Sequence, residues 1–161
     1  MRTKNGNEIE RVDTQDRLLE VWPFFLEGLE SLNDSRRANM EETPEKFFKM
    51  VSRIVGLSKK VTAGAVVVVK SKGGKLLGFG SGFDATGLFP THRILFIYAV
   101  YSNGKNAKAV EDLMNWCEDY AKEAGFQELQ AATGRFSGAA FRWFEGKFGF
   151  RRKSLVFRKK V

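Results

Sequence analysis

The residues of this sequence that could do acid–base chemistry gather around one stretch of the chain. His92 is the only histidine, and an ordinary imidazole exchanges its proton near neutral pH. Tyr98 and Tyr101 follow it, while the stretch from Arg93 to Tyr101 holds no aspartate or glutamate. Because side chains alternate along a strand, we expect Tyr98 and Tyr101 to face opposite sides of a sheet. At most one of them would then line a given pocket, and simple packing remains an alternative role for each.

A second stretch, AAFRWFEGKFGFRRK (Ala139 to Lys153), combines five aromatic and five basic residues in fifteen positions. Rings that stack on bases and cations that meet phosphates are typical of nucleic-acid surfaces. However, Phe141, Phe144 and Phe148 recur at helical spacing, which predicts a buried stripe and leaves the charges in solvent. We favour the helix and keep the nucleic-acid surface as the alternative.

These residues need helices and strands to position them. A first helix, capped by Asp13 or Thr14, contains Pro23, where we expect a kink or a restart. A second helix begins at Thr43 and Pro44, a capping residue followed by a proline that suits the first helical position. Apolar periodicity predicts strands over residues 8–13, 63–70, 75–83, 93–101, 126–133 and 154–160, and helices over 16–32, 43–57, 107–124 and from 137 onward.

The length and composition suit one globular domain over residues 1–161. Of the 161 residues, 43% are hydrophobic and 29% are charged. The single cysteine, Cys117, excludes an internal disulfide, fits a reducing cytoplasmic setting and lies on an apolar helical face that predicts a core position. The polar N-terminus and the short apolar runs predict no signal peptide and no membrane segment.

The charge is distributed unevenly along the chain. Residues 1–57 carry nine Lys/Arg against eleven Asp/Glu, net −2, whereas residues 58–161 carry eighteen against eight, net +10. A basic face of this kind attracts polyanions. We therefore expect weak binding to polyanions that does not depend on their sequence.

Three stretches carry a resemblance to a known family. GGKLLGFGSG resembles a third strand after a tight turn, and LMNWCEDYAKEAGFQEL resembles a helix that leads into a fifth strand. AAFRWFEGKFGF resembles the late-helix signature AA-x-R-F-Y-E-K-x-G-F, with one extra residue before its final GF. Together they resemble the GNAT superfamily of acetyl-CoA-dependent N-acetyltransferases. The resemblance implies an α+β fold with a twisted, mixed and mostly antiparallel sheet of about six or seven strands, flanked by about four helices.

The resemblance also implies a site for acetyl-CoA, the co-substrate. In the family, a loop of pattern Gln/Arg-x-x-Gly-x-Gly/Ala before the long helix wraps the pyrophosphate, where backbone N–H groups and the helix N-terminus favour an anion. Here the pattern falls on KNAKAV, in which Lys108 and Val110 occupy the two glycine positions. Either the backbone amides of this loop still bind the pyrophosphate, or the loop has lost the ability to bind it. The residues implied to contact the co-substrate are Tyr98, Ala99, Val100, Lys105, Asn106, Ala107, Lys108, Ala109, Val110 and Ser137.

Catalysis in the family is usually direct attack by an acceptor amine on the thioester, with a base on the fourth strand and a late-helix tyrosine that protonates the leaving thiolate. Counted forward from the Ala-Ala pair, that tyrosine aligns with Phe144; counted back from Gly149, it aligns with Glu145. Neither is a phenol. His92, Tyr98 and Tyr101 are the candidate catalytic residues that remain.

We therefore expect an acyltransferase that moves an acetyl group from acetyl-CoA to an amine-bearing small molecule or protein, with no metal and no membrane partner. A homodimer is possible. The alternatives are a non-catalytic GNAT-fold binding or structural protein, favoured by the missing glycines and tyrosine, and a basic nucleic-acid-binding module.

Overall fold

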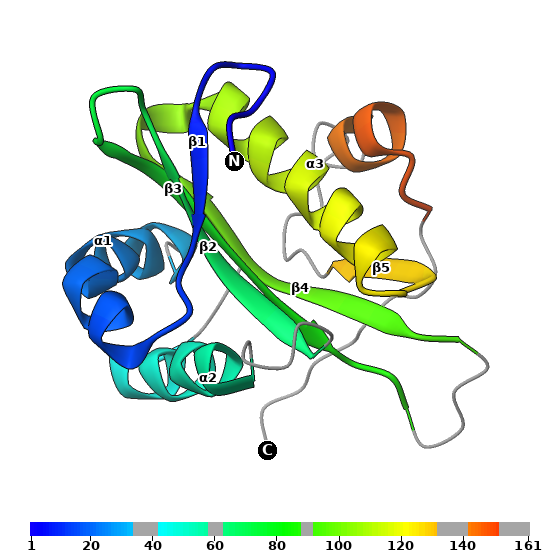
Figure 1. Ribbon diagram of the computed structural model, residues 1–161, viewed down its shortest axis with the longest axis horizontal. Helices are drawn as coiled ribbons and strands as arrows, with labels where there is room; N and C mark the ends of the chain where they lie inside the picture. Colours follow the sequence, from blue (N-terminus) through cyan, green and yellow to red (C-terminus); the bar gives the residue numbers. More distant parts are fainter. Residues whose placement is uncertain (34–41, 58–62, 88–91, 132–141, 152–161) are drawn as a thin grey trace.

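A computed structural model describes residues 1–33, 42–57, 63–87, 92–131 and 142–151, and five strands in these ranges form one twisted sheet (Figure 1). The first four strands run antiparallel to their neighbours, and the fifth runs parallel to the fourth. The predicted mixed, mostly antiparallel α+β sheet is confirmed, with fewer strands than expected; the strand predicted over 154–160 lies outside the described residues. In sheet order the strands are β1 (Glu8–Arg11), β2 (Gly64–Lys70), β3 (Leu76–Asp84), β4 (Ile94–Ser102) and β5 (Glu128–Ala131).

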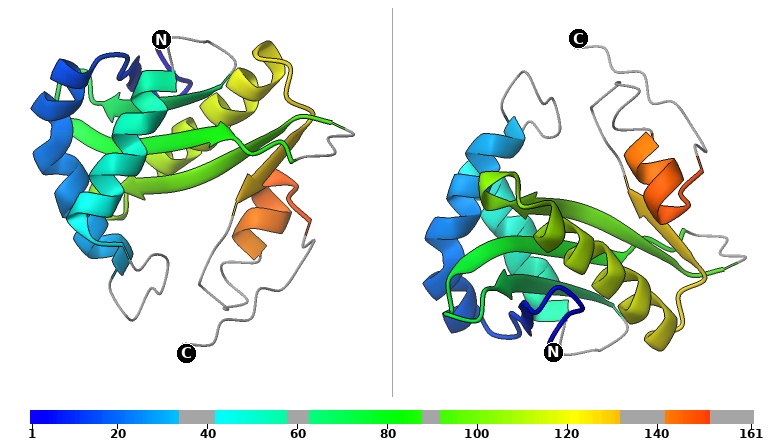
Figure 2. Two further views of the ribbon diagram at one scale, coloured as in Figure 1. Left: turned by 90° about the horizontal axis from the view of Figure 1, so that it is seen from below. Right: turned by 90° about the horizontal axis from the view of Figure 1, so that it is seen from above.

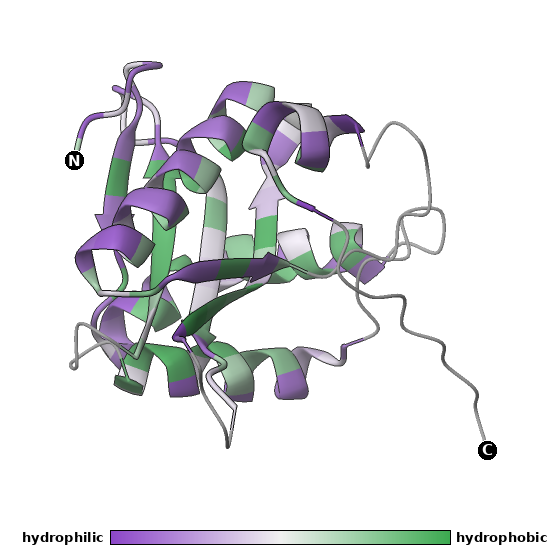
Figure 3. Cartoon of the chain, turned by 90° about the vertical axis from the view of Figure 1, so that its right-hand side faces the viewer, coloured by the Kyte–Doolittle hydropathy of each residue, from purple (hydrophilic) through white to green (hydrophobic). Residues whose placement is uncertain are grey.

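The helices cover both faces of this sheet. α1 (Gln15–Asn33) and α2 (Pro44–Leu57) lie across one face, and α3 (Ala107–Glu123) lies across the other (Figure 2). They turn hydrophobic residues toward the sheet and hydrophilic residues outward (Figure 3). None of the helices in the described ranges is long and apolar enough to cross a membrane.

Short polar side chains fix where these helices begin. Thr14 Oγ1 accepts a hydrogen bond from the amide of Arg17 at 3.2 Å, and Thr43 Oγ1 accepts one from the amide of Lys46 at 3.3 Å. Both are N-caps that satisfy an amide of the first helical turn. α1 passes through Pro23 as one continuous helix, so the predicted restart does not occur.

Aromatic rings pack the face of the sheet that α1 and α2 cover. Phe79 of β3 stacks on Phe25 of α1, with their ring centroids 4.1 Å apart, and is also 6.2 Å from the ring of Phe47 of α2. All three side chains are fully buried. On the other face, Leu113 of α3 packs directly over Gly80, where an added Cβ would lie 3.1 Å from the leucine.

The extra residue of the late-helix signature is accommodated by a π-helical turn. This turn, η2 (Trp143–Lys147), contains Gly146, the residue that the family signature lacks between its glutamate and lysine. A π-helical turn takes one more residue per turn than an α-helix, so it absorbs a single insertion without shifting the flanking segments. The extra residue lies between the Ala-Ala pair and Gly149. The tyrosine position of the signature therefore falls on Phe144 when it is counted from the Ala-Ala pair and on Glu145 when it is counted back from Gly149.

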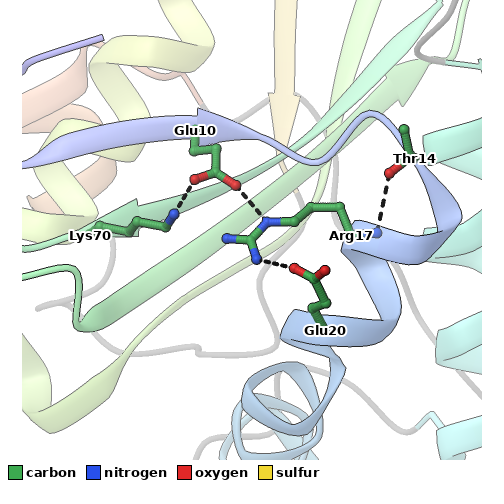
Figure 4. Close-up of polar contacts among 5 residues, drawn as sticks. All are labelled: Glu10, Thr14, Arg17, Glu20 and Lys70. Atoms are coloured by element: carbon green, nitrogen blue, oxygen red, sulfur yellow. Dashed lines mark hydrogen bonds and ion pairs between the residues drawn. The ribbon is translucent and has the colours of Figure 1, made fainter.

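An ion-pair network joins the N-terminal strand to α1 and β2. The carboxylate of Glu10 accepts from Arg17 Nε at 2.6 Å and from Lys70 Nζ, and Arg17 also pairs with Glu20 (Figure 4). Partial burial alone would raise the pKa of Glu10, but the hydrogen bonds and charges of Lys70 and Arg17 outweigh it and lower that pKa below the ordinary 4.5. The folded state therefore favours the ionised carboxylate.

This network predicts a loss of stability in acid. A carboxylate with a lowered folded-state pKa stabilises the protein above pH 4.5, its ordinary value, and the gain disappears as the pH falls through the lowered pKa. We expect Glu10→Gln to reduce the free energy of unfolding by about 1 kcal/mol at pH 7. Urea unfolding at pH 7 and pH 3 measures the free energy of unfolding of the parent and of the variant. A difference between the two proteins that is as large at pH 3 as at pH 7 would contradict the prediction.

Candidate functional site

The sheet opens at Tyr98, the middle of β4. On the β3 side, Ser81 pairs with Ala99 and Gly82 pairs with Ile97, so Tyr98 is left out of the ladder as a β-bulge. On the β5 side, the parallel pairing of the described residues runs from Ile94 and Glu128 to Ile97 and Ala131. The described chain therefore provides no strand partner for the β5-side edge of β4 beyond Ile97, and this edge can accept hydrogen bonds from a ligand.

The bulge also changes which way the two tyrosines point. Tyr98 lies near the rings of Phe47 and Phe83, at centroid distances of 6.1 and 6.4 Å. Tyr101 lies 5.4 Å from the ring of Phe79, in the same core cluster under α1 and α2. The prediction that Tyr98 and Tyr101 face opposite sides was wrong, because the bulge shifts the alternation by one residue between them.

Tyr98 keeps its proton over the whole neutral range. Burial and, after it, the nearby carboxylate of Glu42 raise the pKa of Tyr98 to about 12. Its phenol can therefore donate a proton or a hydrogen bond but cannot act as a base at neutral pH. Tyr101 is 8% exposed and donates a hydrogen bond to Glu27 Oε1 of α1 at 3.3 Å.

The first turn of α3 presents free amides where β4 leaves the sheet. Asn106 caps the helix through its own side chain, because Asn106 Oδ1 accepts from the amide of Ala109 at 3.1 Å. The amide of Val110 donates to the Asn106 carbonyl at 3.2 Å. No hydrogen bond within the described chain uses the amides of Ala107 and Lys108, both of which are exposed. Two backbone donors at a helix N-terminus are thus available to an anion.

Four predicted contact residues remain, of which the structure describes three. Ala99 is buried in the core under α1 and α2, and Val100 packs on the opposite face against the clusters of α3. Lys105 closes the short η1 helix (Asn103–Lys105) before the cap. Ser137 lies outside the described residues.

Phe144, which the resemblance aligns with the family's tyrosine in the forward count, has an apolar setting. Phe144 lies half-buried against the cluster formed by Ile97, Met114 and Cys117, and it meets Phe150 edge-on at 5.6 Å. The burial predicted for Phe144 and Phe148 is therefore partial, and Phe141 lies outside the described residues. Glu145 follows on the same π-helical turn. Cys117 is in the core as predicted, and its burial raises the pKa of the thiol to about 12, so it stays uncharged.

His92 is separated from this site along β4. It precedes the strand, and its Nε2 lies 2.7 Å from Glu128 Oε2 at the start of β5. Tyr98 is six residues further on, or about 20 Å in an extended strand. The structure places Tyr98 in the middle of β4, the first turn of α3 after the C-terminal end of that strand, and His92 before its N-terminal end.

Sequence patterns gave no sign of two polar groups near the site. Glu42, just before the Thr43 cap, acts on Tyr98 from 56 positions away in the chain, so no local spacing reveals it. Asp112 of α3 is 2% exposed and accepts from Asn5 Nδ2 and Asn7 Nδ2, each at 2.8 Å. These amides tie the N-terminal segment to α3 close to its first turn.

Solved structures share this fold over nearly the whole chain. A glucosamine-6-phosphate N-acetyltransferase from Arabidopsis thaliana superposes with a TM-score of 0.66 at 16% identity, covering 96% of this chain and 97% of that one. A GNAT family acetyltransferase from Staphylococcus aureus gives 0.67 at 10% identity, covering 96% and 98%. An aminoglycoside acetyltransferase from an uncultured soil sample, in complex with sisomicin, gives 0.67 at 13%, covering 98% and 97%. No protein-family model and no curated protein matches the sequence. At these identities the likeness establishes the fold, which is that of the GNAT acetyltransferases.

Proposed function

We propose that this GNAT-fold chain is an N-acetyltransferase that uses acetyl-CoA to acetylate an amine. One observation carries the proposal: the bulge at Tyr98 lies in the middle of β4, and the free amides of α3 follow the C-terminal end of the same strand. This half of β4 offers a strand edge that no described strand pairs with, a protonated phenol and an anion site. The acceptors named for the neighbours, an amino-sugar phosphate and an aminoglycoside, differ from each other, so they support acetyl transfer without choosing the acceptor.

The residues at the anion site fit a pyrophosphate in part. The amides of Ala107 and Lys108 would hold the phosphates, with the cation of Lys108 beside them and the N-terminal end of the α3 dipole behind them. The amide of Ala109 is already used by the Asn106 cap, so fewer donors are available than a glycine loop would offer. Acetyl-CoA would supply a thioester whose acetyl group is transferred.

The chain's own residues would then position the bound acetyl-CoA and protonate its leaving sulfur. The open edge of β4 would align the bound molecule, and the core under α1 and α2 would exclude water from one side. Tyr98 would donate its proton toward the leaving sulfur, a role that Phe144 cannot fill because it has no hydroxyl. An incoming amine reaches the site as its free base or loses its proton to water, because β4 carries no carboxylate.

The proposal predicts that CoA binds at α3. A ligand that binds only the folded state raises the free energy of unfolding by RT ln(1 + [L]/Kd), about 2.7 kcal/mol at one hundred times Kd. We expect millimolar CoA to raise the melting temperature by several degrees, and Lys108→Glu to remove most of this shift. Differential scanning fluorimetry measures both.

Lys122→Glu is the matched control, because Lys122 has the same charge but lies in the last turn of α3 and is 67% exposed. It should leave the CoA shift intact. No shift in the parent protein would favour the second candidate, a non-catalytic GNAT-fold module, for which Lys108 and Val110 at the glycine positions and Phe144 in place of tyrosine already argue.

A further inference from the structure

The carboxylate of Glu42 is held beside the candidate site by the end of α1. Asn33, the last residue of α1, donates from Nδ2 to the carbonyl of Glu42 at 2.7 Å and accepts from the Glu42 amide on Oδ1 at 3.1 Å. This reciprocal pair fixes the backbone on both sides of the Glu42 peptide plane. The Thr43 cap of α2 follows immediately, so Glu42 has a defined place between α1 and α2.

Glu42 is half-buried and acts on Tyr98, and the described part of the chain supplies no cationic side chain that pairs with it. Its carboxylate raises the pKa of the Tyr98 phenol, and its backbone is bonded to Asn33, which lines a hollow between α1 and α2. Among the described residues, no lysine or arginine forms an ion pair with it. A carboxylate removed from bulk water without a partner costs free energy, and a cationic ligand would recover that cost.

A hollow lined by Asn33, the residue that holds the Glu42 backbone, has apolar walls that suit an alkyl chain. Its walls include Leu26 and Leu29 of α1 and Pro44 of α2, and its volume is about 480 Å³, within the range of small-molecule sites. Glu30 and Asn33 complete the lining. Glu30 precedes Asn33 by one helical turn on the same side of α1, so a second carboxylate lies along the path that leads to Glu42.

The negative charge of residues 1–57 would favour a cationic acceptor over a phosphorylated one. Residues 1–57, which supply both walls of the hollow, carry net −2, although the whole chain carries +8. The phosphate of a phosphorylated acceptor would face Glu30 and Glu42 and be repelled, whereas an additional ammonium group would be attracted. Among the described residues that line the hollow there is no lysine or arginine.

We propose that the acceptor is an alkyl diamine or polyamine, whose reacting amine lies at the Tyr98 bulge, whose chain packs on Leu26, Leu29 and Pro44, and whose second ammonium group binds the carboxylates of Glu30 and Glu42. This inference rests on the proposed acetyltransferase function and adds a substrate class to it. Glu42 is the specificity-determining residue.

Paired acceptors of equal chain length test the proposal on the full-length chain with acetyl-CoA. We expect kcat/KM for 1,5-diaminopentane to exceed that for 1-aminopentane about 10-fold, the effect of one charged contact. Glucosamine 6-phosphate should be a poorer acceptor than either amine. Glu42→Gln should erase the preference for the diamine, because it should lower kcat/KM for the diamine about 10-fold more than kcat/KM for the monoamine.

Glu45→Gln is the control, because it removes the same charge from the first turn of α2 at an exposed position outside the hollow. The preference should survive it. Equal rates for the two amines, or a preference that survives Glu42→Gln, would overturn this inference and leave acetyl transfer standing. If no amine is acetylated and CoA does not bind, the proposed function fails instead. Calorimetry with 1,5-diaminopentane then decides the inference alone: no binding, or binding that Glu42→Gln does not weaken, overturns it.

Discussion

Replacing Tyr98 with phenylalanine is expected to lower kcat about 10²-fold and to leave the affinity for CoA nearly unchanged. Loss of a general acid typically costs ~10²–10⁴-fold, and a thiolate is a good leaving group, so the lower end applies. The change removes one hydroxyl and keeps the ring that packs near Phe47 and Phe83. Steady-state rates with 1,5-diaminopentane and a thermal-shift titration with CoA separate turnover from binding.

Tyr101→Phe is the matched control for this prediction. It removes a phenol from the same face of the same strand, but that hydroxyl is directed to Glu27 of α1 and not to the bulge. We expect kcat to stay within about threefold of the parent value. A Tyr98→Phe variant that is equally active would show that Tyr98 only packs.

The raised pKa of Tyr98 adds a pH criterion. Because the phenol holds its proton up to about pH 12 in the folded protein, the rate should show no alkaline limb from this group below pH 10, its ordinary pKa. The same shift makes stability depend on pH. Between pH 10 and about pH 12 the Tyr98 phenol is ionised in the unfolded chain but protonated in the folded protein, so the free energy of unfolding falls as the pH rises.

Local patterns were enough to predict most elements and their order. Short apolar runs bounded by turn residues identified β2, β3 and β4 within one or two residues, and the Thr43–Pro44 pair marked the start of α2. The apolar face of α3 predicted the core position of Cys117. These features depend on neighbours within one turn or one strand, which the sequence displays directly.

Features that depend on irregular backbone or distant contacts were missed. The bulge at Tyr98 reverses the alternation of β4, and no residue type in ILFIYAVYS marks it, so the faces of Tyr98 and Tyr101 were assigned wrongly. The π-helical turn was visible only as one extra residue in the signature. Glu42 reaches the site through tertiary packing, since Asn33 and the α1–α2 contact set its place.

The close approach of α1 to the sheet makes Gly28 a second test with a large expected effect. A Cβ built at this position would lie 2.4 Å from Phe79 Cε1 and 2.9 Å from Tyr101 Cδ1, and Gly28 is buried in the middle of α1. Both distances are too short, and the two rings are packed against other rings of the same cluster. Alanine here must push α1 away from the strands.

Gly28→Ala is therefore expected to destabilise the protein by about 2 kcal/mol, although alanine favours a helix interior over glycine by ~1 kcal/mol. Gly56→Ala isolates the propensity term, because Gly56 lies in the last turn of α2 with nothing within 4 Å of the added Cβ. That variant should be neutral or stabilised by up to ~1 kcal/mol. Urea unfolding of both variants measures the change in the free energy of unfolding. A Gly28→Ala variant that is as stable as the parent, or more stable, would mean that α1 moves away from the sheet without cost. Since Tyr101 lies under Gly28 and Glu27 adjoins it, the displaced helix should also weaken binding of the diamine more than binding of CoA, for which we propose a site at α3.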